Sequence, residues 1–171
     1  MIPPKKIMLL GELAVGKSSL VRRLVFDRFE SAYKSTIGVD LYTCQIIVPT
    51  GQGESAVDVV IWDTDGNFSQ SIFRHIYVKG ATAALIVGDV TRQQTLESMV
   101  SLADAFGEAL PGRPLHFALN KVDLLEEKEP LALPRRLADT PLPLIQTSAK
   151  LGANVRHAFN ETTAAIVRRG L

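Results

Sequence analysis

The stretch IMLLGELAVGKSSL, residues 7–20, predicts the fold of the chain around it. Its first four residues are apolar and indicate a buried strand, which ends at Gly11, and a helical pattern begins at Gly16. These glycines, with Lys17 and Ser18, match the spacing G-x-x-x-x-G-K-[ST]. Glycines let several backbone N–H groups converge on a phosphate chain, and the helix N-terminus adds positive charge. Lys17 can then reach the outer phosphates and Ser18 can ligate Mg²⁺. The alternative, a glycine turn with an unrelated lysine, does not account for the flanking strand and helix.

Composition limits the class of protein. The 171 residues, 46% hydrophobic and 22% charged, fit one soluble globular domain spanning residues 1–171. The net charge of +1 implies no strong attraction to nucleic acid or to an anionic membrane. The single cysteine, Cys44, excludes an internal disulfide and fits a reducing, cytoplasmic location. No apolar run is long enough to cross a bilayer. We therefore expect a cytoplasmic monomer that does not bind nucleic acid.

Strand-like and helix-like segments alternate along the chain, which favours a mostly parallel sheet covered by helices. The strand-like segments are residues 6–10, 40–48, 56–62, 83–87, 115–119 and 142–146. The helix-like segments are residues 16–26, 72–78, 91–106, 133–138 and 154–169. Residues 49–53, PTGQG, read as a turn that makes the second and third strands a hairpin. We expect an α/β fold with a six-stranded sheet, one antiparallel edge strand and helices on both faces.

A base-recognition motif follows a strand at residues 120–123, Asn-Lys-Val-Asp. The Asp123 carboxylate can accept two hydrogen bonds from the N1–H and the exocyclic amine of guanine, a pair that adenine does not offer. The stem of Lys121 can cover one ring face, and Asn120 can connect this loop to the phosphate loop. At the end of the last strand, residues 147–150, Thr-Ser-Ala-Lys, can supply a backbone N–H to the guanine oxygen.

A second acidic motif, Trp-Asp-Thr-Asp-Gly at residues 62–66, also ends a strand. Ligands of open α/β sheets bind at the carboxyl ends of strands. Asp63 is therefore placed to hold Mg²⁺ together with Ser18, and the N–H of Gly66 can meet a γ-phosphate.

Taken together, these motifs resemble small Ras-like GTPases, with the Rab branch the most similar. The resemblance rests on GELAVGKSSLVRRLVFDRFE, YKSTIGVD, WDTDG, DVT, NKVD and TSAK, which occur in family order over nearly the whole chain. It implies the G-domain fold of P-loop NTPases, GTP and GDP as ligands with Mg²⁺, and GTP hydrolysis. It also implies an exchange factor, an activating protein and effectors that act through switch I, residues 27–40, and switch II, residues 63–78.

The resemblance assigns roles to individual residues. The implied nucleotide contacts are Leu13, Ala14, Val15, Gly16, Lys17, Ser18, Ser19, Phe29, Tyr33, Thr36, Gly66, Asn120, Lys121, Asp123, Ser148, Ala149 and Lys150. The implied catalytic residues are Lys17, Thr36, Gly66 and Asn67, and the implied Mg²⁺ ligands are Ser18, Thr36 and Asp63. Phe29 would pack on the guanine edge and Tyr33 would cover the phosphates. From the residues alone, a loop threonine, a core phenylalanine and a surface tyrosine are equally ordinary interpretations of positions 36, 29 and 33.

Three positions around the implied γ-phosphate depart from the family pattern. Family members usually continue aspartate-threonine with Ala-Gly-Gln-Glu, whereas this chain has Asp65, Gly66, Asn67 and Phe68. The family glutamine orients the attacking water, and the amide of Asn67 falls short of it by about 1–1.5 Å. Asp65 can repel the phosphate, or bind the metal or the water itself. Leu13 crowds the region that an arginine finger must enter. We expect slow intrinsic hydrolysis, unless a flexible switch region adjusts to the three substitutions.

Alternatives remain open at this stage. One is a GTP-binding scaffold with negligible hydrolysis, and another is a metabolic phosphotransferase, which would not need both guanine motifs. The final residues contain no cysteine for prenylation, so we expect no lipid anchor. The chain is then soluble, has lost a tail, or belongs to a prokaryotic branch without lipidation.

Several other side chains are expected to be structural. The three histidines, His75, His116 and His157, have no ligand-like spacing and are expected on the surface or satisfied in packing. Cys44 is expected to be a small buried hydrophobe. The arginine pairs at 22–23 and 168–169 are expected on solvated helix faces, and Trp62 to be partly exposed.

Overall fold

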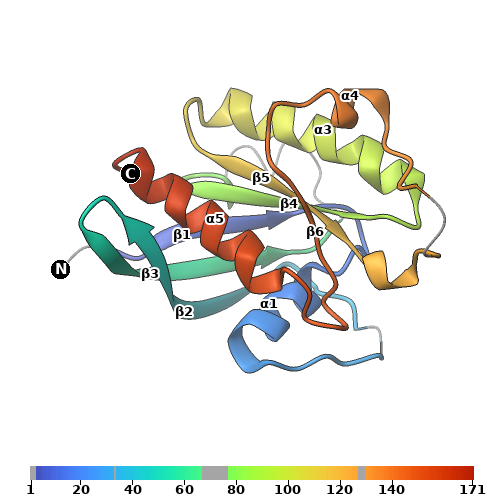
Figure 1. Cartoon of the computed structure of the whole chain (residues 1–171), viewed down its shortest axis with the longest axis horizontal. Coiled ribbons are helices and arrows are strands. Elements are labelled where there is room, and N and C mark those ends of the chain that lie inside the picture. Colours follow the sequence, from blue (N-terminus) through green and yellow to red (C-terminus); the bar gives the residue numbers. More distant parts are fainter. Residues whose placement is uncertain (1–2, 33, 67–76, 127–129) are drawn as a thin grey trace.

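The computed structural model describes residues 3–32, 34–66, 77–126 and 130–171. Its strands are β1 Lys5–Leu10, β2 Val39–Thr50, β3 Gly53–Thr64, β4 Ala83–Asp89, β5 Leu115–Asn120 and β6 Leu144–Gln146. Its helices are α1 Lys17–Phe26, α3 Gln93–Ala109, the short 3₁₀ helix Val122–Leu124, α4 Arg135–Ala138 and α5 Val155–Arg168. Figure 1 shows these elements around one twisted sheet.

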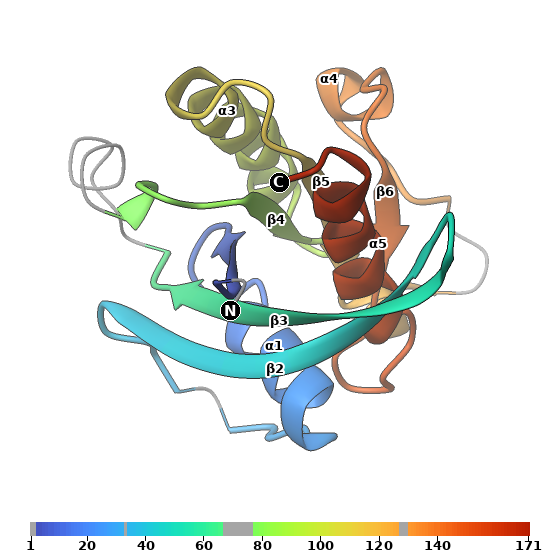
Figure 2. The ribbon, with the colours of Figure 1, turned by 90° about the vertical axis from the view of Figure 1, so that its left-hand side faces the viewer.

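The six strands form one mixed sheet in the order β2-β3-β1-β4-β5-β6. Strand β2 is antiparallel to β3, and every other neighbouring pair is parallel. Figure 2 shows the long β2–β3 hairpin along one side of this sheet. The predicted six-stranded, mostly parallel sheet with one antiparallel edge strand is therefore confirmed.

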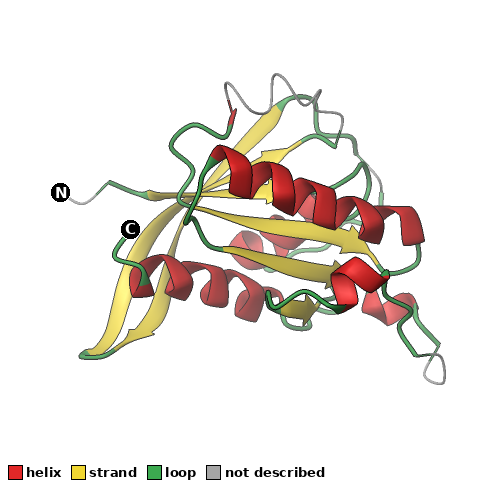
Figure 3. Ribbon diagram, turned by 90° about the horizontal axis from the view of Figure 1, so that it is seen from above, coloured by secondary structure: helices red, strands yellow, loops and turns green. Residues whose placement is uncertain are grey.

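Apolar side chains cover both faces of the sheet. Alternate residues of β1 point to opposite sides, so Ile7 and Leu9 pack in the core beneath α1 and α5, whereas Met8 and Leu10 pack beneath α3. All four side chains are fully buried. Figure 3 shows the helices on the two sides of the sheet. The predicted helices on both faces are likewise confirmed.

The parallel strands bring the functional motifs to one edge of the sheet. Because β4 and β5 run in register from Ala84 and Leu115 to Asp89 and Asn120, their carboxyl ends lie side by side. Strand β1 runs parallel to β4 and β3, so the loop that follows Leu10 opens at the same edge. Figure 1 shows both chain termini near the opposite end, where β1 begins. Among the described residues, no helix combines the length and the apolar character needed to cross a bilayer.

The hairpin turn is tighter than the predicted five residues. The β2–β3 ladder continues to the pair Thr50 and Gly53, so only Gly51 and Gln52 lie in the turn. Pro49 belongs to β2 and not to the turn. An edge strand accommodates proline, because the missing N–H can face away from the sheet.

The bounds of two further elements differ from prediction for local reasons. The N–H and hydroxyl of Thr91 both donate to Asp89 Oδ1, at 2.9 and 2.6 Å, which holds Thr91 in a turn, and α3 begins two residues later. Strand β6 begins at Leu144 instead of residue 142, after Pro143, which has no N–H to give to a ladder. Most of the predicted helix at residues 72–78 lies outside the described residues.

Candidate nucleotide-binding site

A cavity of about 550 Å³ lies at the carboxyl edge of the sheet. Its walls come from the loop after β1, from α1 and the chain after it, from the end of β3, and from the loops after β5 and β6. Of the predicted nucleotide contacts, those that line it are Leu13, Ala14, Gly16, Lys17, Ser18, Ser19, Phe29, Thr36, Gly66, Asn120, Lys121, Asp123, Ala149 and Lys150. One cavity thus joins the motifs predicted for phosphate and for base.

The loop of residues 11–18, called the phosphate loop from here on, is closed around Lys17. The ammonium of Lys17 donates to the carbonyls of Gly11 and Glu12 at 2.9 and 2.8 Å and is 6% exposed. Burial lowers the pKa of Lys17 to about 8, against the opposing effect of carboxylates that include Asp63 and Asp65. A buried cation that holds only backbone carbonyls is well suited to receive an anion, because a phosphate would restore the charge balance.

Gly16 is required by the packing of this loop. It has φ 102° just before α1, and a Cβ there would lie 2.3 Å from Nδ2 of Asn120. That amide donates to the carbonyl of Val15 at 3.0 Å, so the loop after β5 is joined directly to the phosphate loop. Val15 itself is fully buried in the core, so its side chain belongs to the packing and does not line the cavity.

Three oxygen-bearing side chains meet at the start of α1. The hydroxyl of Ser18 lies 2.8 Å from that of Thr36 and donates to Asp63 Oδ2. Asp63 is fully buried, and its Oδ1 has no hydrogen-bond partner among the described residues. Burial raises the pKa of this carboxyl to about 6.

These oxygens fit a hard divalent cation. Mg²⁺ prefers oxygen ligands and is often held by one or two carboxylates together with substrate phosphates. Within the described part of the chain, no group of three or more His, Cys, Asp and Glu side chains forms an alternative metal site. The unpartnered Asp63 Oδ1 supports the same assignment, because an orphaned buried acceptor lacks the compensation that a cation would provide.

The base end of the cavity is built by side chains of β5 and the loop after β6. Lys121 Nζ donates to the carbonyl of Ala14 at 2.8 Å and to Asp89 Oδ2 at 2.7 Å, which places its stem beside the phosphate loop. Asp123 accepts a 2.5 Å hydrogen bond from Ser148 Oγ. Ser148 is buried and its side chain does not line the cavity, and its hydrogen bond orients Asp123.

The N–H of Ala149 has an acceptor within the protein. It donates to Asn120 Oδ1 at 3.2 Å, and the hydroxyl of Thr147 donates to the same oxygen at 3.2 Å. Asn120 therefore connects the loop after β6 to the phosphate loop, with its amide nitrogen on one and its amide oxygen on the other.

At the opposite rim of the cavity, the chain after β3 lies against the phosphate loop and is bonded to the residue before β2. A Cβ placed on Gly66 would lie 2.2 Å from the backbone nitrogen of Leu13, so the two backbones are in direct contact. The side chain of Leu13 is 40% exposed at this rim. The carboxylate of Asp65 accepts a 3.1 Å hydrogen bond from the N–H of Gly38. Tyr33 and Asn67, also predicted for this region, lie outside the described residues.

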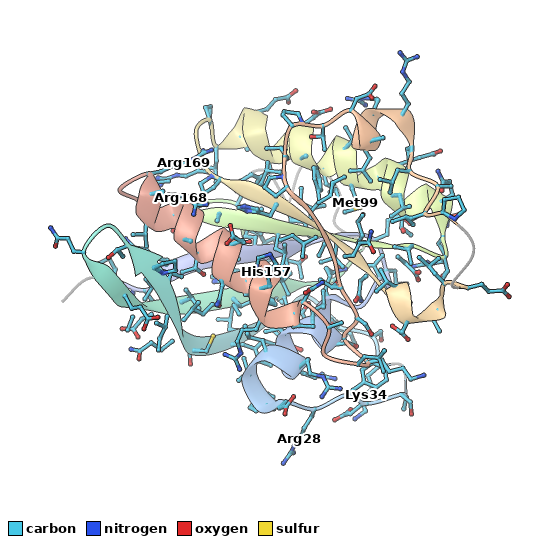
Figure 4. The ribbon with its side chains drawn as sticks, viewed as in Figure 1. Arg28, Lys34, Met99, His157, Arg168 and Arg169 are labelled. Carbon is cyan, nitrogen blue, oxygen red and sulfur yellow. The ribbon has the colours of Figure 1, made fainter. Side chains whose placement is uncertain are left out.

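Several residues at the site were not singled out from the sequence. Arg28 and Lys34 line the cavity from the segment after α1, where Figure 4 labels them. Arg92 Nη2 donates to the Leu13 carbonyl at 2.7 Å, and Ser98 donates to the Glu12 carboxylate, so α3 supports the outer side of the phosphate loop. No local motif marks these α3 contacts, because only the fold brings positions about 80 residues apart together.

Two expectations about structural side chains are wrong. Arg23 does not lie on a solvated face, because it donates to the carbonyls of Ala149 and Lys150 at 2.9 and 2.6 Å. His116 is 3% exposed, and its Nδ1 has no hydrogen-bond partner among the described residues, so it is buried but not satisfied. No local sequence signal marks the Arg23 contacts, because they join positions 126 and 127 residues apart.

The other expectations have mixed outcomes. Cys44 is only half-buried against the core. Trp62 is partly exposed, as predicted, with the ammonium of Lys6 over its ring at 3.5 Å. His157 is exposed on α5, where Figure 4 labels it, and His75 lies outside the described residues.

The fold and the site define a nucleotide-binding protein of the P-loop class, with a G-domain arrangement of strands and loops. A family model described as "Ras family" matches residues 6–168, so this chain belongs to the Ras family.

Rab-type proteins are among its relatives. It is 33% identical over 170 residues to Ypt/Rab-type GTPase ypt7 of Schizosaccharomyces pombe, covering 94% of this chain and 80% of that protein. It is 34% identical over 161 residues to Ras-related protein Rab7 of Drosophila melanogaster, covering 90% and 76%. It is also 32% identical over 166 residues to Ras-related protein RABF2a of Arabidopsis thaliana, covering 95% and 81%. The chain is thus a Ras-like protein of the small GTP-binding type, similar to Rab GTPases.

Proposed function

We propose that this protein is a guanine-nucleotide switch that binds GTP and GDP with Mg²⁺ and hydrolyses GTP slowly. The main support for the proposal is that one cavity holds both the motif for base recognition and the ligands for phosphate and metal. Asp123, held by Ser148, lies at one end, and Ser18 and Thr36 meet above the buried Asp63 at the other. A guanine base and a phosphate-bound cation satisfy these two ends together.

The metal would be held by Ser18, Thr36 and Asp63, and when bound it would neutralise charge on the phosphates. Lys17 would give its ammonium to the outer phosphates in place of the carbonyls that now accept it. Thr36 and Gly66 belong to switch I and switch II, so a γ-phosphate would draw both segments onto the phosphate loop, and its loss would release them.

Slow hydrolysis is supported by the residues at the γ-phosphate rim. Asn67 follows Gly66 where the family has glutamine, and its shorter arm would leave the attacking water poorly placed. Leu13 is 40% exposed at the rim, where an activator's arginine would need to enter. We therefore expect such an activator to work poorly or to approach differently.

Partners of a switch would contact the segments that change. Ile37 is 91% exposed and Leu41 58% exposed, so two large apolar side chains of switch I and the start of β2 face solvent. We propose that exchange factors, activators and effectors bind through residues 27–40 and 63–78.

Single-turnover hydrolysis tests the proposal, with wild type compared to Asn67→Gln. We expect the longer amide to raise the rate by about ten- to a hundredfold, because an error of about 1 Å in placement costs a rate factor of that order. The Kd for GDP should stay the same, because Asn67 is predicted to act at the γ-phosphate, which GDP lacks. A wild-type rate typical of Rab proteins that does not respond to Asn67→Gln contradicts slow hydrolysis.

The same samples separate the alternatives. Competition by GDP but not ADP supports guanine recognition at Asp123, and equal competition by ADP overturns it. No measurable hydrolysis in either form would favour the GTP-binding scaffold, which the substitutions at Leu13, Asp65 and Asn67 also motivate.

A further inference from the structure

Strands β2 and β3 stay joined one step beyond the end of their regular ladder. The last ladder pair at this end is Val39 with Thr64. At the next position, the N–H of Asp65 donates to the carbonyl of Gly38 at 3.0 Å. The N–H of Gly38 donates in return to the side chain of Asp65, with Oδ2 at 3.1 Å. The two residues therefore exchange two hydrogen bonds.

The side chain replaces a backbone acceptor in this pair. In a regular antiparallel pair, opposite residues exchange both N–H···O bonds through their backbones. Here one acceptor is the Asp65 carboxylate, so the pairing is kept while the chain turns at Gly66 onto the backbone of Leu13. An alanine, the residue that family members usually have here, has no side-chain acceptor to offer Gly38.

We propose that Asp65 is a positioning residue that fastens switch I to switch II and so keeps Thr36 at the Mg²⁺ site. Thr36 is two residues from Gly38, and its hydroxyl lies 2.8 Å from that of Ser18. The proposal rests on the function proposed above and adds to it how the triphosphate is retained. Asp65 would favour the closed arrangement of switch I and slow the escape of a nucleotide that engages Thr36.

The charge of Asp65 has a counterpart at the site. Asp65 and Asp63 both stabilise the protonated form of Lys17, whose pKa burial otherwise lowers. The carboxylate thus accepts the N–H of Gly38 and also acts electrostatically on the ammonium of Lys17. Two roles can therefore be separated by mutation: acceptance of the Gly38 hydrogen bond, and negative charge near the phosphates.

The experiment compares Asp65→Ala, which removes the acceptor and the charge, with Asp65→Asn, which removes the charge and keeps an acceptor. Release of a fluorescent, non-hydrolysable GTP analogue is measured with Mg²⁺, and release of fluorescent GDP is measured in parallel. We expect Asp65→Ala to speed release of the triphosphate by about three- to tenfold, the scale of one partly exposed hydrogen bond to a charged acceptor. Release from Asp65→Asn should stay within about twofold of wild type.

A matched control is Asp58→Ala in the same hairpin. The Asp58 carboxylate accepts a 3.1 Å hydrogen bond from Gln45 on the exposed part of β2 and β3, so this variant also removes one cross-strand bond. It should leave both release rates unchanged. Equal acceleration in Asp58→Ala and Asp65→Ala would mean that any loosening of the hairpin suffices, and would overturn the proposal.

A double-mutant comparison tests whether Asp65 acts through Thr36. In a Thr36→Ala background, Asp65→Ala should add little to triphosphate release, because the residue being positioned is gone. A full additional effect there, or equal acceleration of GDP and triphosphate release, overturns the positioning role. Similar behaviour of Asp65→Asn and Asp65→Ala assigns the effect to charge and also overturns it. Wild type that fails to retain fluorescent GDP at all rejects the proposed function itself.

Discussion

The base end and the γ-phosphate rim of the cavity are built differently. At the base end, Asn120 and Lys121 donate to carbonyls of the phosphate loop, and Ser148 orients Asp123. At the rim, the hydrogen-bonded pair of Asp65 and Gly38 connects switch II to switch I. The backbone contact of Gly66 with Leu13 connects switch II to the phosphate loop.

We interpret this difference as a division between recognition of the nucleotide at the base end and response to the triphosphate at the rim. At the base end, the buried Asn120 bonds to the backbone of two loops and Ser148 bonds to Asp123, so these groups hold one another without a ligand. Among the described residues, the contacts at the rim join loop segments to one another, and loop regions open at a lower free-energy cost than core strands. We expect mutations at the base end to weaken binding of every guanine nucleotide, and mutations at the rim to act mainly on the triphosphate.

The largest expected effect is at the base end. Asp123→Ala removes the acceptor of both predicted guanine hydrogen bonds, so affinity for GDP should fall by about a hundredfold or more. Calorimetric titration with GDP and with ADP measures this, and the already weak binding of ADP should not change. Asp104→Ala is the control, because its exposed carboxylate on α3 pairs with Arg136 of α4 and neither residue lines the cavity. A loss in GDP affinity below about tenfold would remove Asp123 from base recognition.

An intermediate effect is expected at the rim from Gly66→Ala. The new Cβ would lie 2.2 Å from the nitrogen of Leu13, so switch II must move away from the phosphate loop. The single-turnover rate of GTP hydrolysis should fall by about a hundredfold, because the displaced segment precedes the water-orienting position. The Kd for GDP should change by less than about threefold, since the diphosphate contacts are elsewhere.

The control for that variant is Gly107→Ala in α3. A Cβ there meets nothing within 4 Å, and alanine stabilises a helix slightly, so hydrolysis should be unaffected. If Gly66→Ala weakened GDP binding as much as it slowed hydrolysis, the rim would contribute to binding of the diphosphate as well as to hydrolysis, which contradicts the division between the two ends of the cavity.

The smallest effect is expected outside both regions, at His116. Burial lowers the pKa of this side chain below 6.5, with Glu161 opposing the shift and Arg168 and Arg169 adding to it. The unfolded chain therefore binds the proton more readily, so this contribution to stability is full above 6.5 and is lost as the pH falls from 6.5 through the lower pKa of the folded state. His116→Leu should reduce the drop in Tm between about pH 7.5 and about pH 5.5.

His157→Gln is the matched control, because this side chain is exposed on α5 and its replacement should leave Tm nearly unchanged. Neither variant should alter GDP affinity. A change in GDP affinity with His116→Leu would indicate that the core beneath α5 is coupled to the cavity.

The sequence predicted the fold and the main motifs because each motif is local. Residues 7–20 combine a buried strand, a glycine loop and a helix start. Asp63 and Asn120 lie within the last two residues of β3 and β5, and Asp123 follows β5 by three residues. The order of these elements along the chain then determines which strand ends meet. What remained uncertain were boundaries such as the β2–β3 turn, where Pro49 fits an edge strand as well as a loop.

The contacts between motifs were mostly not predictable. The sequence indicated that Asp65 is unusual but left open whether it meets a phosphate, a metal or water, and the structure places its carboxylate on the N–H of Gly38. The reason is that the hydrogen-bond partner of a loop side chain depends on how two loops lie relative to each other. The same applies to Arg92 and Leu13, whose contact follows from tertiary packing alone. The monomeric state, the cytoplasmic location and the single-domain extent stay predictions.

The contact of Arg23 with the carbonyls of Ala149 and Lys150 closes a circuit around the cavity. The path runs from the phosphate loop along α1 to Arg23, across to residues 149–150, through Asn120, and back to the phosphate loop at Val15. Because these hydrogen bonds join α1, the loop after β6 and the phosphate loop in one ring, α1 cannot move away from the loop after β6 without breaking the bonds of Arg23.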